Sequence, residues 1–294
     1  MLKQTLFFSN PAKLSLKDKQ LVISKKDSKD VITRSIEDIG FVVVENQQVI
    51  VTIPLLNELV SNNVSVIICD AKGMPSSLFM GLNNNSTQAE SLKYQIDVTE
   101  PSRKQAWKQI IEQKIRNQAS VLDKLGIEHH NLKVYYSSVL SGDSSNREGI
   151  AARQYWTHLF GKKFRRERYG LPPNNLLNYG YAILRAATAR ALLGSGLLPA
   201  LSLFHRNRYN AFPLADDVME PYRPYVDEIA FNAVEEGHLD LDKDLKVRML
   251  NLLVTDVNIG QVRRPLSIAL TTTSASLLKY YKGETKKLSL PVFA

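Results

Sequence analysis

Acidic residues and a histidine in the second half of the sequence have the types and spacing of a metal site. Asp217 and Glu220 stand three residues apart, so in a helical turn their side chains would point within about 60° of each other. Two carboxylates on one face repel and raise each other's pKa, and a divalent cation would satisfy both. His205 precedes them, where an apolar stretch becomes polar. The alternative is that these acids only cap or begin a helix.

Prolines indicate where these acids lie relative to the next helix. Pro221 and Pro224 follow Glu220, and proline is tolerated in a first helical turn but is costly further in. Apolar residues then recur at helical spacing, namely Val226, Ile229, Ala230, Ala233 and Val234. We therefore expect the acids at a fixed junction, at the head of a packed helix.

A further acid, Glu148, lies in the first turn of another predicted helix. Asn146 or Ser145 is the expected cap, and Ala151, Ala152, Tyr155, Trp156 and Leu159 form its buried face. Gly149 costs about 1 kcal/mol relative to alanine inside a helix. This cost indicates that backbone or substrate must come close there. Taken alone, Glu148 is also consistent with a structural first-turn acid.

The composition favours a polyanionic partner. The 294 residues include 38 Lys+Arg and 29 Asp+Glu, for a formal net charge of +9. This charge favours nucleic acid before membrane, although a merely basic protein would carry the same charge. Two groups of cations suit phosphate contacts or a solvated surface. They are Lys162, Lys163, Arg165 and Arg166 in one run, and Arg206 and Arg208 beside His205.

Cysteine content and hydropathy exclude several classes of protein. The single cysteine, Cys69, excludes an intrachain disulfide framework and fits a reducing cytosol. The first residues have too short an apolar run for a signal peptide, and no run approaches the roughly 20 apolar residues of a membrane span. We therefore expect a cytoplasmic protein that does not enter a membrane.

The fold class predicted from these patterns is α+β. A small β-rich domain with a short helix is expected over 1–80, a linker over 81–101 and a larger all-α domain over 102–294. Strands are expected at 5–8, 31–33, 41–44 and 64–69, with a hairpin over 13–24 and a helix over 53–60. Helices are expected from 102 to beyond 122, and over 131–140, 144–160, 176–193, 241–253 and 259–280. The first of these has an apolar stripe that includes Trp107 and a polar basic face over 114–118.

Several motifs in order resemble one known family. They are Glu148 in the segment 146–156, His205 after Gly196-Leu-Leu-Pro199, and Glu220 within 217–224, with 175–181 between the first two. Together they resemble the CRISPR-associated endonuclease and spacer integrase family. The resemblance runs from about 114 to 227, and the plan of a β domain, a linker and a helical domain extends it over nearly the whole chain.

The resemblance implies a site and a reaction. Glu148, His205 and Glu220 would be catalytic and bind one divalent metal ion, Mg²⁺ or Mn²⁺, with Asp217 as a supporting acid. The implied enzyme is a CRISPR adaptation integrase, a metal-dependent DNA endonuclease. It would insert short foreign DNA duplexes into the CRISPR array through attack of a 3′-hydroxyl on a phosphodiester.

The resemblance also implies partners. They are double-stranded DNA, as spacer precursor and CRISPR repeat, and a small companion adaptation protein that bridges two homodimers in the integration complex. Pattern and length look like the variant of type II systems, whose effector nuclease is a further partner. Two alternatives stay open, and neither requires integration. One is a stand-alone metal-dependent DNA nuclease, and the other is a non-catalytic DNA-binding scaffold.

Overall fold

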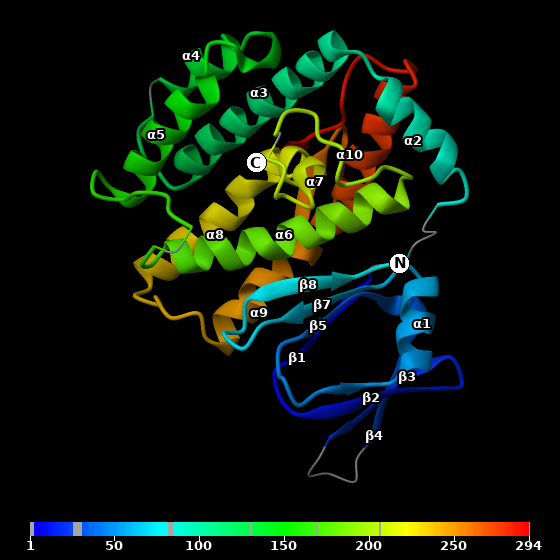
Figure 1. The fold of residues 1–294 in the computed structure, drawn as a ribbon. Coiled ribbons are helices and arrows are strands. Elements are labelled where there is room, and N and C mark those ends of the chain that lie inside the picture. The colour runs from blue at the N-terminus through cyan, green and yellow to red at the C-terminus, as the bar shows by residue number, and fades with distance from the viewer. Residues whose placement is uncertain are drawn as a thin grey trace. The chain divides into compact units, whose positions relative to one another are not determined.

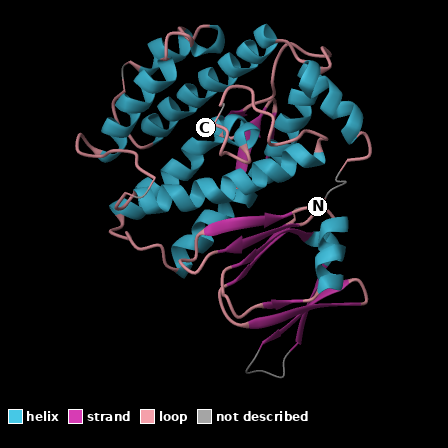
Figure 2. Cartoon of the chain, in the orientation of Figure 1, coloured by secondary structure: helices cyan, strands magenta, loops and turns pink. Residues whose placement is uncertain are grey.

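The computed structural model describes residues 3–25, 31–81, 85–129, 131–168, 170–205 and 207–293. The chain forms two compact units, Met1–Asn84 and Asn85–Ala294, which are described separately below (Figure 1). Strands dominate the first unit and helices the second (Figure 2). Arg206, one of the expected phosphate contacts, lies outside the described residues.

Two sheets make up most of the N-terminal unit. One has the order β1-β5-β7-β8, in which β1 (Gln4–Phe8), β5 (Ile39–Val44) and β7 (Ser65–Cys69) are parallel and β8 (Pro75–Phe79) is antiparallel to β7. The other has the order β4-β3-β2-β6, from β4 (Val31–Ser35), β3 (Gln20–Lys25), β2 (Ala12–Lys17) and β6 (Ile50–Val51). The predicted hairpin is β2–β3, whose turn residues Asp18 and Lys19 have positive φ.

Alternating and continuous apolar patterns explain the core of this unit. All six residues of β5 are buried, as expected for a strand covered on both faces. Helix α1 (Ile53–Ser61) begins with Pro54 in its first turn and places Leu55 and Leu59 in the core beside Leu14 and Leu21. The strands and the short helix predicted for this unit are therefore confirmed.

The C-terminal unit is mainly helical. Its helices are α2 (Gln88–Asp97), α3 (Glu100–Lys124), α4 (Leu132–Ser137), α5 (Arg147–Phe160), α6 (Asn174–Gly194), α7 (Pro213–Val218), α8 (Arg223–Glu235), α9 (Lys243–Asn251) and α10 (Leu266–Tyr281). Short 3₁₀ segments lie at η2 (Ser141–Asp143), η3 (Glu220–Tyr222) and η4 (Leu252–Val254). Helix α3 packs against α4, α5, α8, η2 and η3, which makes it the central element of the unit (Figure 1). None of the described helices is long and apolar enough to cross a membrane.

The end of the chain differs from the prediction. The helix expected over 259–280 begins only at Leu266, because β9 (Asp256–Ile259) and β10 (Val262–Pro265) precede it. Gly260 closes the turn between these strands with a φ of 61°, and a proline at 265 keeps the preceding residue extended. Strand β11 (Pro291–Val292) completes a three-stranded sheet. The unit is thus mainly helical and not all-α.

The segment expected as a linker also contains regular structure. Helix α2 lies within 81–101 and packs against α10. Gln95, on α2, is buried and donates to the carbonyl oxygens of Leu198 and Leu201 at 3.0 and 3.1 Å. These contacts place the segment within the C-terminal unit. They join residues far apart in the sequence, so no local pattern predicts them.

Candidate active site

Lys114 on α3 brings two of the predicted catalytic acids together. Its Nζ lies 2.6 Å from Oε1 of Glu148, on α5, and 2.6 Å from Oε2 of Glu220, on η3. Lys114 and Glu220 are buried, with exposed fractions of 8% and 3%. Two acids from distant parts of the sequence therefore share one cation, largely away from water.

Burial and neighbouring charges shift the pKa values of Lys114 and Glu220 in opposite directions. Burial alone would raise the pKa of Glu220, but the charges of Arg223 and Lys114 lower that pKa below its ordinary value. Burial alone would lower the pKa of Lys114, but the charges of Glu148 and Glu220 raise it. At neutral pH the cluster therefore holds a carboxylate at Glu220 and an ammonium at Lys114.

The start of α5 fixes the position of Glu148. Asn146 is the N-cap and accepts the backbone N–H of Gly149 at 3.3 Å. The Asp143 carboxylate accepts the N–H groups of Arg147 and Glu148 at 2.7 and 3.0 Å. A Cβ at position 149 would lie 2.6 Å from Asn146 Oδ1. The close approach expected at Gly149 is therefore made by the capping side chain, and not by backbone or substrate.

Asp217 organises the segment that carries His205. Its carboxylate is fully buried and accepts the backbone N–H groups of Leu203, Phe204 and His205 at 2.7, 3.0 and 3.3 Å. His205 Nδ1 lies 2.5 Å from Asp217 Oδ1. This hydrogen bond raises the pKa of His205 against the opposing effect of partial burial, and the charges of Asp217, Glu220 and Glu148 raise it further. A metal or substrate would therefore meet this imidazole at Nε2.

Asp217 and Glu220 do not act as the paired carboxylates that their spacing indicated. Asp217 faces the His205 segment, whereas Glu220 pairs with Lys114 and with the Arg223 Nε, 3.0 Å from its Oε1. Helix α7 ends at Val218 and Glu220 begins a 3₁₀ segment, so the two side chains are not on one continuous helix. The acid that shares a cation with Glu220 is Glu148.

An aromatic stack supports the His205 segment from α3. The rings of Phe204 and Trp107 are parallel, with centroids 4.5 Å apart, and the His205 ring meets the Trp107 ring edge-on at 5.5 Å. Trp107 and Lys114 are seven residues apart, about two helical turns, so they lie on one face of α3. This helix therefore contacts all three predicted metal ligands or the segments that carry them.

Four residues that build this site were not singled out from the sequence. They are Trp107, Lys114, Asp143 and Asn117, whose Nδ2 donates to the carbonyl oxygen of Pro221, next to Glu220, at 2.7 Å. The sequence pattern places Trp107 on an apolar stripe, which is buried as predicted, and Lys114 on a polar face, although Lys114 is buried as well. The spacing does indicate that Lys114 is buried, because it lies seven residues from both Trp107 and Val121 and so shares their buried face. A lysine on the buried face of a helix requires an anionic partner.

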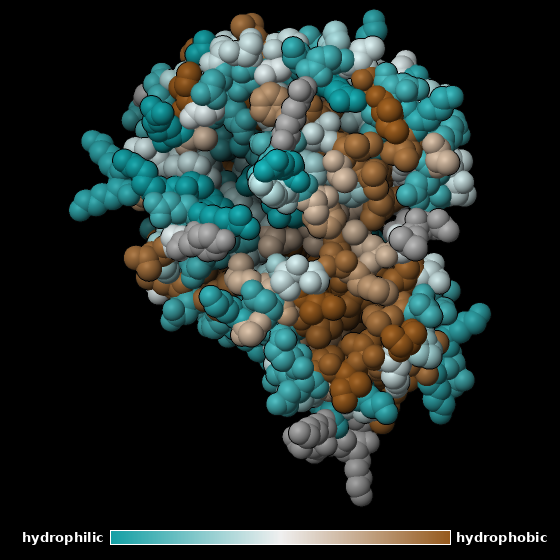
Figure 3. Space-filling view, in the orientation of Figure 1, coloured by the Kyte–Doolittle hydropathy of each residue, from teal (hydrophilic) through white to brown (hydrophobic). Residues whose placement is uncertain are grey.

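The basic residues predicted to contact DNA have different surroundings. Lys162, Lys163 and Arg165 are exposed on the loop after α5, where hydrophilic side chains project from the surface (Figure 3). Arg166 is half-buried and donates to the side-chain oxygens of Asn174 and Asn178 at 3.0 and 2.7 Å. Arg208 is exposed, with its guanidinium 4.7 Å from the Tyr209 ring centroid. Arg166 is thus half-buried among internal hydrogen bonds, whereas Arg165 stays exposed although its guanidinium donates to the carbonyl oxygens of Lys162 and Phe164 at 3.0 and 2.9 Å.

Asp227 lies in a buried network behind the site. Its carboxylate accepts hydrogen bonds from Tyr155 at 3.0 Å and from Tyr181. Burial raises the pKa of Asp227 to about 7, against these hydrogen bonds and the charges of Arg223 and Arg166. Arg223 lies over the Tyr181 ring at 4.6 Å, which connects this network to Glu220.

We expect Asp227 to make the protein less stable as the pH rises from 5 to 8. Its folded-state pKa of about 7 exceeds the ordinary 3.8, so at pH 5 the folded state holds the proton and the unfolded state does not, whereas at pH 8 both states have lost it. The free energy of unfolding should fall by about 2–3 kcal/mol more in the wild type than in Asp227→Asn, which does not titrate. Urea denaturation of both proteins at pH 5 and pH 8 measures this difference. Equal pH dependence in the two proteins would refute the expectation.

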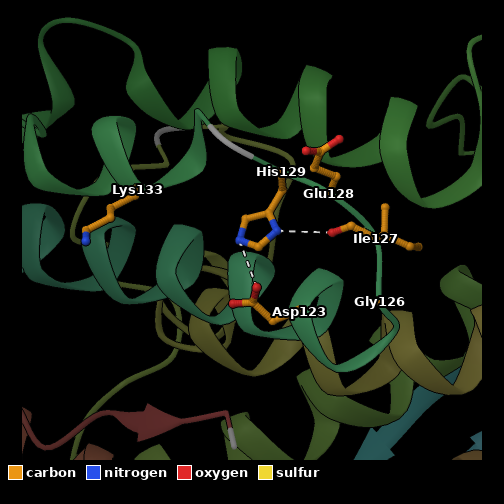
Figure 4. A pocket seen from close by; sticks show the side chains of 6 residues that line it. All are labelled: Asp123, Gly126, Ile127, Glu128, His129 and Lys133. Atoms are coloured by element: carbon orange, nitrogen blue, oxygen red, sulfur yellow. Dashed lines mark hydrogen bonds and ion pairs between the residues drawn. The ribbon is translucent and has the colours of Figure 1, made fainter.

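A cavity of about 500 Å³ lies at the C-terminal end of α3 (Figure 4). It is lined by Asp123, Gly126, Ile127, Glu128, His129 and Lys133. The His129 ring is held between the Ile127 carbonyl oxygen, at 3.1 Å, and the Asp123 carboxylate, at 3.4 Å. Asp123 is about 13 Å along the helix from Lys114, so this cavity is separate from the acid cluster.

The donor atoms of the cluster fit a divalent cation. Within the described ranges, no three His, Cys, Asp or Glu side chains are close enough together to hold a metal ion. However, the Glu148 and Glu220 carboxylates already surround one cation. Glu220 Oε2 is buried and makes an ion pair with Lys114 but no well-directed hydrogen bond. Hard carboxylate oxygens beside an imidazole suit Mg²⁺ or Mn²⁺.

A β-rich unit followed by a helical unit, in a basic chain with such a cluster, has the features of metal-dependent enzymes that act on DNA phosphodiesters. Comparison with known sequences then identifies the family. The profile described as CRISPR associated protein Cas1 matches residues 6–258. The CRISPR-associated endonuclease Cas1 of Neisseria meningitidis serogroup C (strain 8013) is 38% identical over 260 residues, 87% of this chain and 84% of the relative. The chain therefore belongs to the Cas1 family.

Solved structures have the same fold. A casposase bound to integration product matches with a TM-score of 0.80 and 20% identity, covering 98% of this chain and 93% of that chain. A chain of a Cas6-RT-Cas1–Cas2 complex matches with a TM-score of 0.76 and 20% identity, covering 98% of this chain and 36% of that chain.

Membership in the family defines the activity. The chain is a CRISPR adaptation endonuclease and integrase, a metal-dependent DNA nuclease of antiviral defence. Cas1 proteins have been solved with DNA and in Cas1–Cas2 complexes. The predicted family, function and α+β fold class are therefore confirmed.

Proposed function

We propose that Glu148, His205 and Glu220 are the catalytic residues and hold one Mg²⁺ or Mn²⁺ ion, and that Asp217 positions His205. The convergence of Glu148 and Glu220 on a single cation is the observation that carries this proposal. The ion, when bound, would polarise the phosphodiester and activate the attacking hydroxyl. The contacts of Asp217 with the His205 segment support its positioning role.

The roles of the remaining groups follow from this assignment. Asp143 and Asn146 hold the first turn of α5, so that Glu148 projects from a fixed position. Asp217 holds Nδ1 of His205, which leaves Nε2 as the ligand atom. The incoming 3′-hydroxyl attacks a phosphodiester at the edge of the CRISPR repeat and displaces the original 3′-hydroxyl. One phosphodiester forms as one breaks, so the reaction needs no ATP.

We propose that the protein acts on double-stranded DNA, namely the spacer precursor and the CRISPR repeat. The exposed cations Lys162, Lys163, Arg165 and Arg208 suit contacts with its phosphates. Arg166 is a weaker candidate, because it is half-buried and its guanidinium donates to Asn174 and Asn178.

We further propose that the protein forms a homodimer, and that Cas2 is the companion that bridges two such dimers in the cytoplasm of a prokaryote. An apolar surface on the N-terminal unit supports a role in dimerisation or partner contact (Figure 3). The exposed apolar side chains of this unit include Val31, Ile50, Ile53, Ile68 and Phe79. The effector nuclease of a type II system is a further proposed partner.

A strand-transfer assay tests the proposed function. It uses a supercoiled CRISPR-array plasmid, a short duplex with free 3′ ends, Mn²⁺ and the companion protein. We expect metal-dependent joining at the repeat boundary in the wild type. His205→Ala should reduce joining by about 100-fold or more, because a metal ligand contributes several kcal/mol to the transition state.

Three other outcomes would favour an alternative function or refute the role of His205. Cutting without joining by the wild type would favour a stand-alone nuclease. Full joining by a folded His205→Ala variant would refute the assignment of His205. DNA binding by the folded wild type, with no metal-dependent cutting or joining, would favour a non-catalytic scaffold.

A further inference from the structure

Lys114 occupies an unusual position for a lysine. Its ammonium contacts Glu148 and Glu220 at 2.6 Å each, with a side-chain exposed fraction of 10%. Its helix, α3, is held on the same face by the fully buried residues Trp107, Ile110, Ile111 and Val121. Lys114 is therefore delivered to the two acids by a long helix that packs against several other elements, and not by an exposed surface segment.

The charges of the cluster balance without a metal ion. Two carboxylates, Glu148 and Glu220, face two cations, Lys114 and Arg223. Removal of Lys114 alone would leave two acids close together with a single counter-charge, which is unfavourable in a buried site. Addition of a divalent cation with Lys114 in place would instead leave an excess of two positive charges. The metal-bound and lysine-bound arrangements therefore oppose each other electrostatically.

The two arrangements also compete for the same two carboxylates. A divalent ion held by Glu148 and Glu220 needs oxygens at about 2.0–2.1 Å for Mg²⁺, and Lys114 engages Oε1 of Glu148 and Oε2 of Glu220. Arg223 engages the other oxygen of Glu220, so it can remain in place. Lys114 is thus the group that must move.

We propose that Lys114 is an internal counter-ion that occupies the metal position between Glu148 and Glu220 and is displaced when the metal ion binds. This inference rests on the proposed metal ligands. It gives Lys114 two effects: it keeps the two acids together in the metal-free protein, and it lowers metal affinity by competition. Metal binding then depends on the cost of breaking both ion pairs.

Mn²⁺ binding measured by calorimetry on the full chain tests this competition. Lys114→Gln keeps a side chain of similar length without the charge, and we expect it to bind Mn²⁺ about 10- to 100-fold more tightly than the wild type. Lys108→Gln is the matched control, because Lys108 lies on the same helix and pairs with Glu112 at the surface at 3.5 Å. The control should bind Mn²⁺ as the wild type does.

Thermal unfolding supplies an independent readout. Without metal, Lys114→Gln should have a lower Tm than the wild type and the control, and saturating Mn²⁺ should raise its Tm by a larger amount. Equal or weaker Mn²⁺ binding by folded Lys114→Gln would overturn the inference. Failure of the wild type itself to bind Mn²⁺ would overturn the proposed metal site instead.

A measurement on the wild type covers the case in which the variant does not fold. In protein labelled with ¹⁵N at lysine Nζ, the buried ammonium of Lys114 should give a distinct signal that shifts as Mg²⁺ is added. The shift should saturate at the same Mg²⁺ concentration as binding. A Lys114 signal that is unchanged at saturating Mg²⁺ would overturn displacement.

Discussion

Asp217→Asn is expected to reduce strand transfer by about 100-fold or more while the protein remains folded. The asparagine oxygen can still accept backbone N–H groups from the His205 segment. Without the negative charge, however, the ring of His205 loses the partner that fixes Nδ1 as the protonated nitrogen. Because we propose Nε2 of His205 as a metal ligand, both metal affinity and the rate of joining should fall.

A neighbouring acid supplies the control for this prediction. Asp216 is also buried but pairs with Arg185 at 2.7 Å and with Asn210 at 2.7 Å. Asp216→Asn should therefore keep strand transfer within a few-fold of the wild type. The plasmid assay and Mn²⁺ calorimetry measure both variants. Equal losses in the two variants would show that any buried acid of α7 matters only for folding, and would contradict the specific role of Asp217.

Asn117→Leu is expected to lower the free energy of unfolding by about 3–5 kcal/mol. Asn117 is fully buried, and its Nδ2 donates to the carbonyl oxygens of Pro221 and Pro291 at 2.7 and 3.0 Å. Its Oδ1 accepts the N–H of Phe293 at 3.1 Å and Gln113 Nε2 at 2.7 Å. Leucine preserves the approximate shape but leaves these groups unpaired, at about 1–3 kcal/mol for each buried group.

Guanidinium denaturation of the wild type, Asn117→Leu and Gln113→Ala checks this value. Gln113→Ala removes one of the four hydrogen bonds, at a partly exposed side chain, and should cost about 1 kcal/mol or less. Asn117 also joins α3 to Pro221, the neighbour of Glu220, so Asn117→Leu should weaken Mn²⁺ binding as well. If Asn117→Leu lowers the free energy of unfolding by less than about 1 kcal/mol, then water or a local shift satisfies the four groups that hydrogen-bond Asn117 in the wild type.

Local patterns were sufficient for most of the N-terminal unit. Alternation around a polar turn predicted the β2–β3 hairpin, and a mostly apolar run predicted β7. Pro54 after Thr52 placed the start of α1 correctly. These predictions succeeded because each depends on residues adjacent in the chain, where side-chain alternation and turn preferences act directly.

Local patterns were not sufficient for the ends of the helical unit. Residues 81–101 are polar enough to resemble a linker, yet α2 is ordered by contacts with α10 and with the segment after α6. The apolar residues around 259–265 continue a helical pattern, but Gly260 and β11 convert that stretch into a sheet. In both places a partner distant in the sequence overrides the local preference.

For the candidate site, the sequence indicated the residue types but not which of them meet. The residue types and their order along the chain, with Glu148, then His205, then Asp217 and Glu220, were sufficient to indicate a metal-dependent enzyme and its family. They did not reveal which acids meet, because the distance between side chains on α5, η3 and the His205 segment depends on how these elements pack around α3. Only the folded chain pairs Glu148 with Glu220 through Lys114 and turns Asp217 toward His205. The physical reason is that buried charges must find opposite charges wherever packing places them, and that choice is made in three dimensions.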